Sequence, residues 1–264
     1  MLEIKNIYKT FNPGTINEKV ALNGLSLKLN EGDFVTVIGG NGAGKSTMLN
    51  AVAGVWPVDE GQILIDGTDV TKLSEYKRAA YLGRVFQDPM TGTAATMGIE
   101  ENLALAKRRG KARVLRSGIT KAERAEYKEL LKILDLGLED RLTSKVGLLS
   151  GGQRQALTLL MATLQKPKLL LLDEHTAALD PKTASKVLAI TDKIVNRDHL
   201  TTLMITHNMK DAIAHGNRLI MMMNGKIVLD IQGEEKKKLT VKQLLDKFEE
   251  ASGEEFSNDS AILG

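Results

Sequence analysis

The chain has 264 residues, of which 42% are hydrophobic, and a formal net charge of +3. This length allows a sizeable core, and so mild a charge does not by itself argue for nucleic-acid binding. Disulfides and thiolate metal sites are excluded because there is no cysteine, which fits the cytosol. No run approaches the ~20 apolar residues of a membrane-spanning helix. No signal peptide is visible either. We therefore expect any membrane role to come through a partner.

Strand-like sequence fills residues 2–38. Leucines alternate with polar residues in Ala21–Leu29, and Phe34–Ile38 is almost wholly apolar. A helix is predicted over Met48–Ala53, closed by Gly54, and a small antiparallel hairpin over Gln62–Gly67.

Residues 90–148 change in character and predict a separate helical lobe. Ile99–Arg109 is typical of a helix. A capping box at Thr120–Glu123 opens a second helix, predicted to run through Leu136 and to stop at Gly137.

An alternation of helix and strand follows residue 148 and predicts a mostly parallel, covered sheet. Its elements are Gln153–Gln165 (helix), Leu169–Leu172 (strand), Pro181–Arg197 (helix), Thr201–Thr206 (strand), and a hairpin of Arg218–Met223 and Lys226–Asp230 around Asn224-Gly225. A last helix is predicted over Thr240–Ala251, and the polar, acidic end, Ser252–Gly264, is expected to fray.

A glycine-rich loop lies between the Phe34–Ile38 strand and the first helix. It reads Gly39-Gly40-Asn41-Gly42-Ala43-Gly44-Lys45-Ser46-Thr47, which has the G-x-x-x-x-G-K-[ST] spacing. Glycines allow successive backbone N–H groups to surround a phosphate, and the helix start adds its positive dipole. Lys45 can reach the β- and γ-phosphates, and the Ser46 hydroxyl can bind Mg²⁺. A chance glycine-rich turn is the alternative, but the flanking strand and helix favour a nucleoside triphosphate site.

Two carboxylates, Asp173 and Glu174, follow the buried strand Leu169–Leu172. Ligands of open α/β sheets bind at this end of the strands. Asp173 suits a Mg²⁺ site and Glu174 suits an attacking water, although an ordinary polar loop is possible.

Leu149-Ser150-Gly151-Gly152-Gln153 precedes a clear helix. Ser150 or a glycine can cap it and leave free N–H groups for an anion, although serine and glycine are also common at ordinary helix starts. Within one chain, a second anion site for the same phosphate would be redundant. This helix start would have a role if it bound a phosphate held by another copy of the chain.

With these motifs the chain resembles the ATP-binding subunit of an ATP-binding cassette (ABC) transporter over about residues 2–230. The motifs follow the family's order: Gly39–Thr47, Gln87, Leu149–Gln153, Asp173-Glu174, Ala178–Asp180 and His207. The resemblance implies an α/β fold: a P-loop NTPase (RecA-like) core with a mostly parallel sheet, an N-terminal antiparallel β subdomain and an inserted α-helical subdomain. The implied nucleotide-binding domain is 1–231, with its core at 1–89 and 149–231 and its helical subdomain at about 90–148. A C-terminal helix and flexible tail would occupy 232–264.

The resemblance also implies roles for single residues. Phe11 would stack on adenine, and Gln87 would contact Mg²⁺ and water and sense a transmembrane partner. Ser150, Gly151, Gly152 and Gln153 would bind the γ-phosphate across a head-to-tail dimer, with Asp180 between the two sites. Catalytic roles fall to Glu174, His207, Gln87 and Lys45, and Mg²⁺ ligation to Ser46, Gln87 and Asp173. Ordinary alternatives are core packing for Phe11, a solvated turn for Gln87, a helix cap for Asp180 and a structural histidine for His207.

His175 stands where many family members have proline. Its side chain could approach the catalytic site, but a tolerated loop substitution is favoured. His199 and His215 lie outside any motif and are given no role. The basic run Lys107–Arg113 has no interleaved aromatic residues, so a solvated edge is favoured over nucleic-acid binding or proximity to an anionic membrane.

The implied function is ATP hydrolysis, with ATP and Mg²⁺ as cofactors, that powers transport at the cytoplasmic face of the cell membrane. The implied partners are a second copy of the chain, transmembrane permease subunits and an extracytoplasmic substrate-binding protein. The sequences of Phe11–Leu27 and Asp173–Pro181 resemble those of a bacterial importer branch whose proposed cargoes include aromatic amino acids. A soluble ABC-type ATPase acting on nucleic acid or ribosomes is the alternative, although such relatives usually carry two cassettes, coiled coils or zinc insertions. A generic P-loop kinase would give no reason for Leu149–Gln153.

Overall fold

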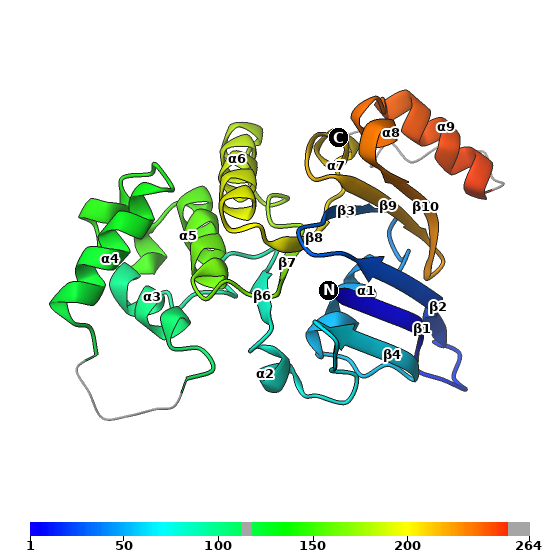
Figure 1. Ribbon diagram of the computed structural model, residues 1–264, viewed down its shortest axis with the longest axis horizontal. Coiled ribbons are helices and arrows are strands. Elements are labelled where there is room, and N and C mark those ends of the chain that lie inside the picture. The colour runs from blue at the N-terminus through cyan, green and yellow to red at the C-terminus, as the bar shows by residue number, and fades with distance from the viewer. Residues whose placement is uncertain (112–117, 253–264) are drawn as a thin grey trace.

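Ten strands form two sheets in the computed structural model, which describes residues 1–111 and 118–252. The first sheet is antiparallel, in the order β2-β1-β4-β5 (Figure 1). Its members are β1 (Leu2–Phe11), β2 (Lys19–Leu29), β4 (Glu60–Ile65) and β5 (Thr68–Asp69). The predicted N-terminal antiparallel sheet and the hairpin at Asp66-Gly67 are confirmed.

The second sheet has the order β10-β9-β3-β8-β7-β6. Its strands are β3 (Phe34–Ile38), β6 (Leu82–Val85), β7 (Leu169–Asp173), β8 (Thr201–Ile205), β9 (Arg218–Met223) and β10 (Lys226–Gln232). All neighbours pair in parallel except β10, which returns antiparallel from β9 through Asn224-Gly225. This is the predicted mostly parallel sheet, closed at one edge by the predicted hairpin.

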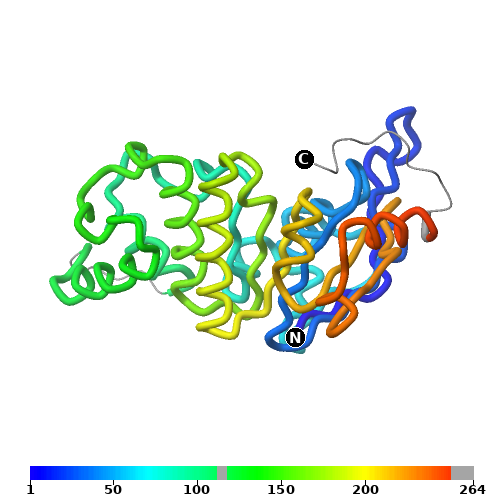
Figure 2. Tube along the Cα trace, turned by 90° about the horizontal axis from the view of Figure 1, so that it is seen from above, coloured from blue at the N-terminus to red at the C-terminus, as the bar shows by residue number. Residues whose placement is uncertain are grey.

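Helices cover both faces of the second sheet, as Figures 1 and 2 show. The helices of the described residues are α1 (Lys45–Ala53), α2 (Glu75–Arg78), α3 (Ile99–Lys107), α4 (Lys121–Lys132), α5 (Gly151–Thr163), α6 (Pro181–Asp198), α7 (Met209–Ala214), α8 (Gly233–Lys237) and α9 (Val241–Ser252). In Figure 1, α3 and α4 lie beyond α5, away from the sheet. Two 3₁₀ turns, Leu138–Asp140 and Val146–Leu148, lie before α5. Within the described residues, no helix combines the length and apolar character needed to cross a membrane.

The leucine run of β7 shows how the core is divided. Side chains alternate between the faces of a strand. Leu169 and Leu171 pack in a cluster with α1 and the first sheet, whereas Leu170 and Leu172 pack with α3, α4, α5 and α6. Both faces of the strand are therefore covered, which explains why its sequence is continuously apolar.

The helix that begins at the Thr120 capping box ends at Lys132, four residues before the predicted end at Leu136. Asp135 adopts φ 53°, a left-handed conformation that cannot continue a helix. Residues of α3 and α4 share the second core cluster with β7 and α5. The helical subdomain at about 90–148 and the boundary at 231 stay predictions, and the tail from 253 lies outside the described residues.

His175 anchors the turn after β7 to helix α6. Its side chain is buried, and its Nε2 lies 3.0 Å from the Thr191 Oγ1. The Thr191 hydroxyl donates to the Val187 carbonyl oxygen at 2.9 Å, so the hydroxyl oxygen accepts from a neutral His175. The ring is bound to α6 rather than to Glu174 or His207, and the interpretation of His175 as a tolerated loop substitution stays a prediction.

Burial lowers the pKa of His175 to about 4, and the charge that His215 can carry adds to this effect. Because the unfolded chain would bind the proton near pH 6.5, the stabilisation from neutral His175 is present above pH 6.5. It is lost as the pH falls toward 4. We expect this residue to account for up to about 3 kcal/mol of acid destabilisation in that window.

His175→Gln should flatten the decline of the free energy of unfolding between pH 6.5 and 4, measured by urea denaturation. His199→Asn is the control, since His199 is exposed and asparagine tolerates its φ of 49°. A His175→Gln variant with the parent's pH slope would show that burial of this ring is not the cause.

Candidate functional site

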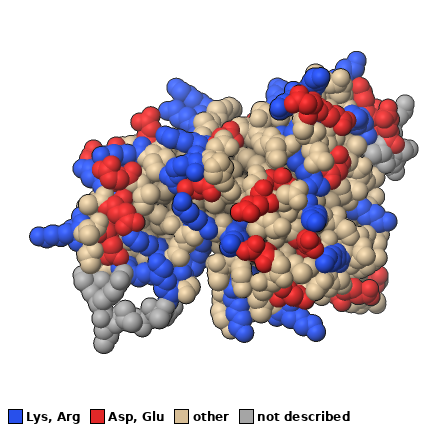
Figure 3. Space-filling view, in the orientation of Figure 1, with Lys and Arg blue, Asp and Glu red and all other residues tan. Residues whose placement is uncertain are grey.

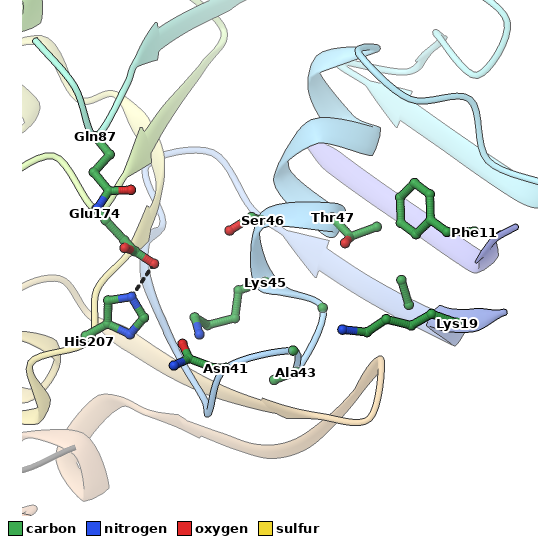
Figure 4. Close-up of a pocket in the computed structure, with 13 residues that line it drawn as sticks. Phe11, Lys19, Asn41, Ala43, Lys45, Ser46, Thr47, Gln87, Glu174 and His207 are labelled. Carbon is green, nitrogen blue, oxygen red and sulfur yellow. Dashed lines mark ion pairs between the residues drawn. The ribbon is translucent and has the colours of Figure 1, made fainter. Parts of the chain in front are cut away.

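A cavity of about 400 Å³ lies along the loop between β3 and α1. Its lining comes from the β1–β2 hairpin, this loop, and the ends of β6, β7 and β8 (Figure 4). The lining residues are Phe11, Lys19, Ala21, Asn41, Gly42, Ala43, Gly44, Lys45, Ser46, Thr47, Gln87, Glu174 and His207. The cavity thus gathers residues that the sequence places up to 196 positions apart, from Phe11 to His207.

Glycine is required at both ends of the loop for steric reasons. Gly39 has φ 147°, and a Cβ there would lie 2.2 Å from the Met222 carbonyl oxygen. Gly44 has φ 99°, and its Cβ would lie 2.5 Å from the Ala21 carbonyl oxygen. The loop is therefore held between β9 and β2, with its backbone close to both strands.

Lys45 is buried at the base of this loop. Its Nζ donates to the carbonyl oxygens of Gly39, at 2.6 Å, and Gly40, at 3.1 Å. Burial lowers the pKa of Lys45, and the carboxylates of Glu174 and Asp173 oppose that shift. Gly39 and Gly40 thus hold the lysine rather than line the cavity, and the ammonium is positioned beside the loop that would receive phosphate.

Glu174 and His207 form an ion pair at one end of the cavity. His207 Nε2 lies 2.6 Å from Glu174 Oε1. Strands β7 and β8 are neighbours, and the Glu174 N–H donates to the Ile205 carbonyl oxygen at 3.1 Å. Glu174 has φ 47°, a strained conformation for glutamate. The sheet register therefore brings the two side chains together, as Figure 4 shows.

Asp173 lies beside the cavity and is bound to a residue that the sequence analysis did not single out. Arg84 Nη2 lies 3.5 Å from Asp173 Oδ2 and 2.7 Å from Asn50 Oδ1. Burial raises the pKa of Asp173, and the positive charges of Arg84 and Lys45 oppose the shift. Arg84 thus connects β6 with both β7 and α1.

Gln87, the second residue after β6, is exposed and lines the cavity. The preceding residue is fixed, because the Gln155 Nε2 of α5 donates to the Phe86 carbonyl oxygen at 3.0 Å. The segment that carries Gln87 is therefore connected to α5.

Phe11 lines the opposite end of the cavity and packs edge-on against Trp56, with ring centroids 4.9 Å apart. In this position Phe11 can both pack on the core and stack on adenine. Lys19 pairs with Phe11 across the β1–β2 hairpin. Sequence reasoning missed Lys19 because the second strand was expected to begin only at Ala21.

Ser150–Gln153 and Asp180 do not line this cavity. Ser150 caps α5, since its Oγ accepts from the Gln153 N–H at 3.3 Å, and Asp180 caps α6 through the Thr183 N–H at 3.1 Å. A Cβ at Gly152 would lie 2.1 Å from the Thr183 Cγ2, so α5 and α6 approach closely there. Within one chain, the structure does not bring these residues to the phosphate loop.

A family model described as ABC transporter matches residues 22–177. The tyrosine transport ATP-binding protein of Clostridioides difficile is 49% identical over 257 residues, which cover 95% of this chain and 100% of that protein. The methionine import ATP-binding protein MetN of Rhizobium etli is 38% identical over 212 residues. That match covers 79% of this chain and 56% of the relative, so the chain spans about half of the longer protein.

The fold is similar to solved ATP-binding cassettes. A dimeric cassette in a post-hydrolysis state, bound to ADP and Pi, has a TM-score of 0.74 and 31% identity, covering 88% of this chain and 98% of that one. A cassette of an ABC transporter in its ADP conformation has a TM-score of 0.76 and 27% identity, with 94% and 98% covered. The predicted fold class is confirmed. The chain belongs to the ABC transporter family, as an ATP-binding subunit that hydrolyses ATP to power transport.

Proposed function

We propose that this chain is the ATPase of an amino-acid importer, with aromatic amino acids as the cargo class. The observation that carries the ATPase site is the cavity in which the phosphate loop and Lys45 face the Glu174–His207 pair. The cargo class rests on the relative that is named for tyrosine transport and matches 95% of this chain. The chain would act at the cytoplasmic face of the membrane on separate permease subunits, supplied by an extracytoplasmic substrate-binding protein.

The cavity has two distinct ends that suit ATP. Phe11 offers an aromatic surface for adenine at one end, and Glu174 and His207 lie at the γ-phosphate end (Figure 4). Phosphoryl transfer passes through a loose transition state that depends mainly on positioning and charge neutralisation. Lys45 and the loop N–H groups neutralise phosphate charge, Glu174 orients or deprotonates water, and His207 holds Glu174 and the γ-phosphate.

The residues proposed for Mg²⁺ fit its preference for oxygen ligands. Ser46, which is exposed, and Gln87 line the cavity. Asp173 is the last residue of β7 and precedes Glu174, which also lines the cavity. The described residues hold no group of three or more histidine, cysteine or acidic side chains arranged for a metal. A site shared with phosphate oxygens needs no such group. When bound there, Mg²⁺ would neutralise the charge on the β- and γ-phosphates.

A second copy of the chain would complete the site. Ser150 caps α5, and Gly151 is exposed and does not line its own chain's cavity. The N-terminus of a 13-residue helix favours an anion. In a head-to-tail dimer, Ser150, Gly151 and Gly152 would meet the partner's γ-phosphate. The similar solved cassette is itself dimeric.

Nucleic-acid binding has less support than transport. Lys107 and Arg108 of the basic run are paired with Glu126 and Glu123 of α4. Acidic and basic side chains are interspersed over the face drawn in Figure 3. Charges paired in this way favour a solvated surface over a phosphate-binding stripe.

Glu174→Gln should retain ATP binding and lower hydrolysis by about 10²–10⁴-fold, because the base is lost while the phosphate donors remain. We also expect the variant to accumulate as an ATP-bound dimer in size-exclusion chromatography with ATP and Mg²⁺. Lys45→Ala is the matched control and should instead lose ATP affinity. Hydrolysis at the parent's rate would refute the role of Glu174.

Ser150→Arg places a bulky cation where the two copies would meet. The isolated variant should bind ATP like the parent but neither dimerise nor hydrolyse, because Ser150 lies outside its own cavity. Mixing it with Lys45→Ala should restore partial hydrolysis, since one hybrid site then has an intact phosphate loop and an intact Ser150 loop. Loss of ATP binding by the Ser150→Arg monomer would place this loop in the same chain's site.

The cargo class is tested with the subunit in its assembled transporter. The permease and binding protein that co-purify with this chain should be reconstituted in vesicles. Tyrosine, phenylalanine or tryptophan should then stimulate ATP hydrolysis, whereas methionine and spermidine should not. Stimulation by methionine or a polyamine instead would leave the ATPase assignment intact and refute the aromatic cargo.

A further inference from the structure

Lys19 brings a second ammonium group to the cavity. It is the first residue of β2 and the cross-strand partner of Phe11. In Figure 4 its side chain extends from the strand toward the phosphate loop, on the same side as Phe11. Lys19 thus lies between the aromatic end of the cavity and the loop.

The Lys19 ammonium lies close to the middle of the loop. A Cβ built on Gly42 would lie 3.3 Å from Lys19 Nζ. The residues that the structure describes give this ammonium no ion pair or hydrogen bond, and the neighbouring Glu18 carboxylate accepts from the Gly14 N–H at 2.6 Å. The charge of Lys19 is therefore available to a ligand.

The two lysines of the cavity have different surroundings. Lys45 is buried, donates to two loop carbonyls, and is influenced by Glu174 and Asp173. Lys19 is exposed and lies toward Phe11. A polyphosphate along the loop would therefore meet Lys45 near its terminal phosphates and Lys19 near the phosphate closest to the nucleoside.

We propose that Lys19 is a nucleotide-binding residue that contacts the α-phosphate. The inference rests on the proposed placement of adenine at Phe11 and of the γ-phosphate at Glu174 and His207. The α-phosphate joins the nucleoside to the rest of the chain, so it lies beside the position that Lys19 reaches. An ammonium binds phosphate as a point charge without demanding a fixed geometry, which suits a long side chain at a strand end.

The test measures equilibrium affinities of Lys19→Met for ATP, ADP, adenosine monophosphate and adenosine. We expect about tenfold weaker binding of all three phosphorylated ligands, by similar factors, because each carries the α-phosphate. Adenosine affinity should not change. Lys19→Arg keeps the charge and should restore most of the affinity.

Lys28→Met is the matched control, since Lys28 lies on the same strand, exposed and away from the cavity, and should bind every ligand like the parent. A loss confined to ATP and ADP would place Lys19 on the β-phosphate and overturn the proposal. Equal losses for adenosine would indicate packing on the nucleoside, and unchanged affinities would indicate a solvated lysine. Both outcomes also overturn it. If Lys45→Ala too leaves ATP binding unchanged, the phosphate-loop site itself is wrong.

Discussion

The site depends on the hydrogen bonds that hold the buried ammonium group of Lys45. This group is held by the carbonyl oxygens of Gly39 and Gly40, and the charges of Glu174 and Asp173 lie near enough to oppose the effect of its burial. A charged group is costly to bury unless it is hydrogen-bonded and paired. The loop, β7 and the turn after it must therefore keep their relative positions, and the parallel pairing of β3, β8 and β7 provides that constraint.

Much of the fold was predictable because its signals are local. The apolar run of β7 and the Asn224-Gly225 turn identify their elements without reference to the rest of the chain. The predicted end of α4 was wrong, because the sequence does not show that Asp135 adopts a left-handed conformation. Helices α2 and α7 have four and six residues, too few to show a period.

The cavity lining was predictable where the spacing of residues forms a motif, as in Asn41–Thr47. Lys19 and Arg84 could not be found in this way, because each depends on a pairing between strands. Lys19 reaches the cavity through its cross-strand partner Phe11, and Arg84 meets Asp173 only because β6 pairs with β7. Such contacts follow from the register of the sheets, which a single sequence does not specify.

The charges of the cavity explain why one copy would be an incomplete enzyme. Under the proposed function, the carboxylate of Glu174 that activates water would also repel the γ-phosphate. Lys45 is bound to two loop carbonyls and, under the proposed function, would also serve the terminal phosphates, so further positive potential would be needed where Glu174 lies. The capped N-terminus of α5 can supply it, but its residues do not line their own chain's cavity. Under the proposed dimer, closure brings this helix end to the partner's γ-phosphate, and hydrolysis removes the ligand that holds the copies together. Assembly and ATP turnover would then be one electrostatic cycle, which is the property a transport motor requires.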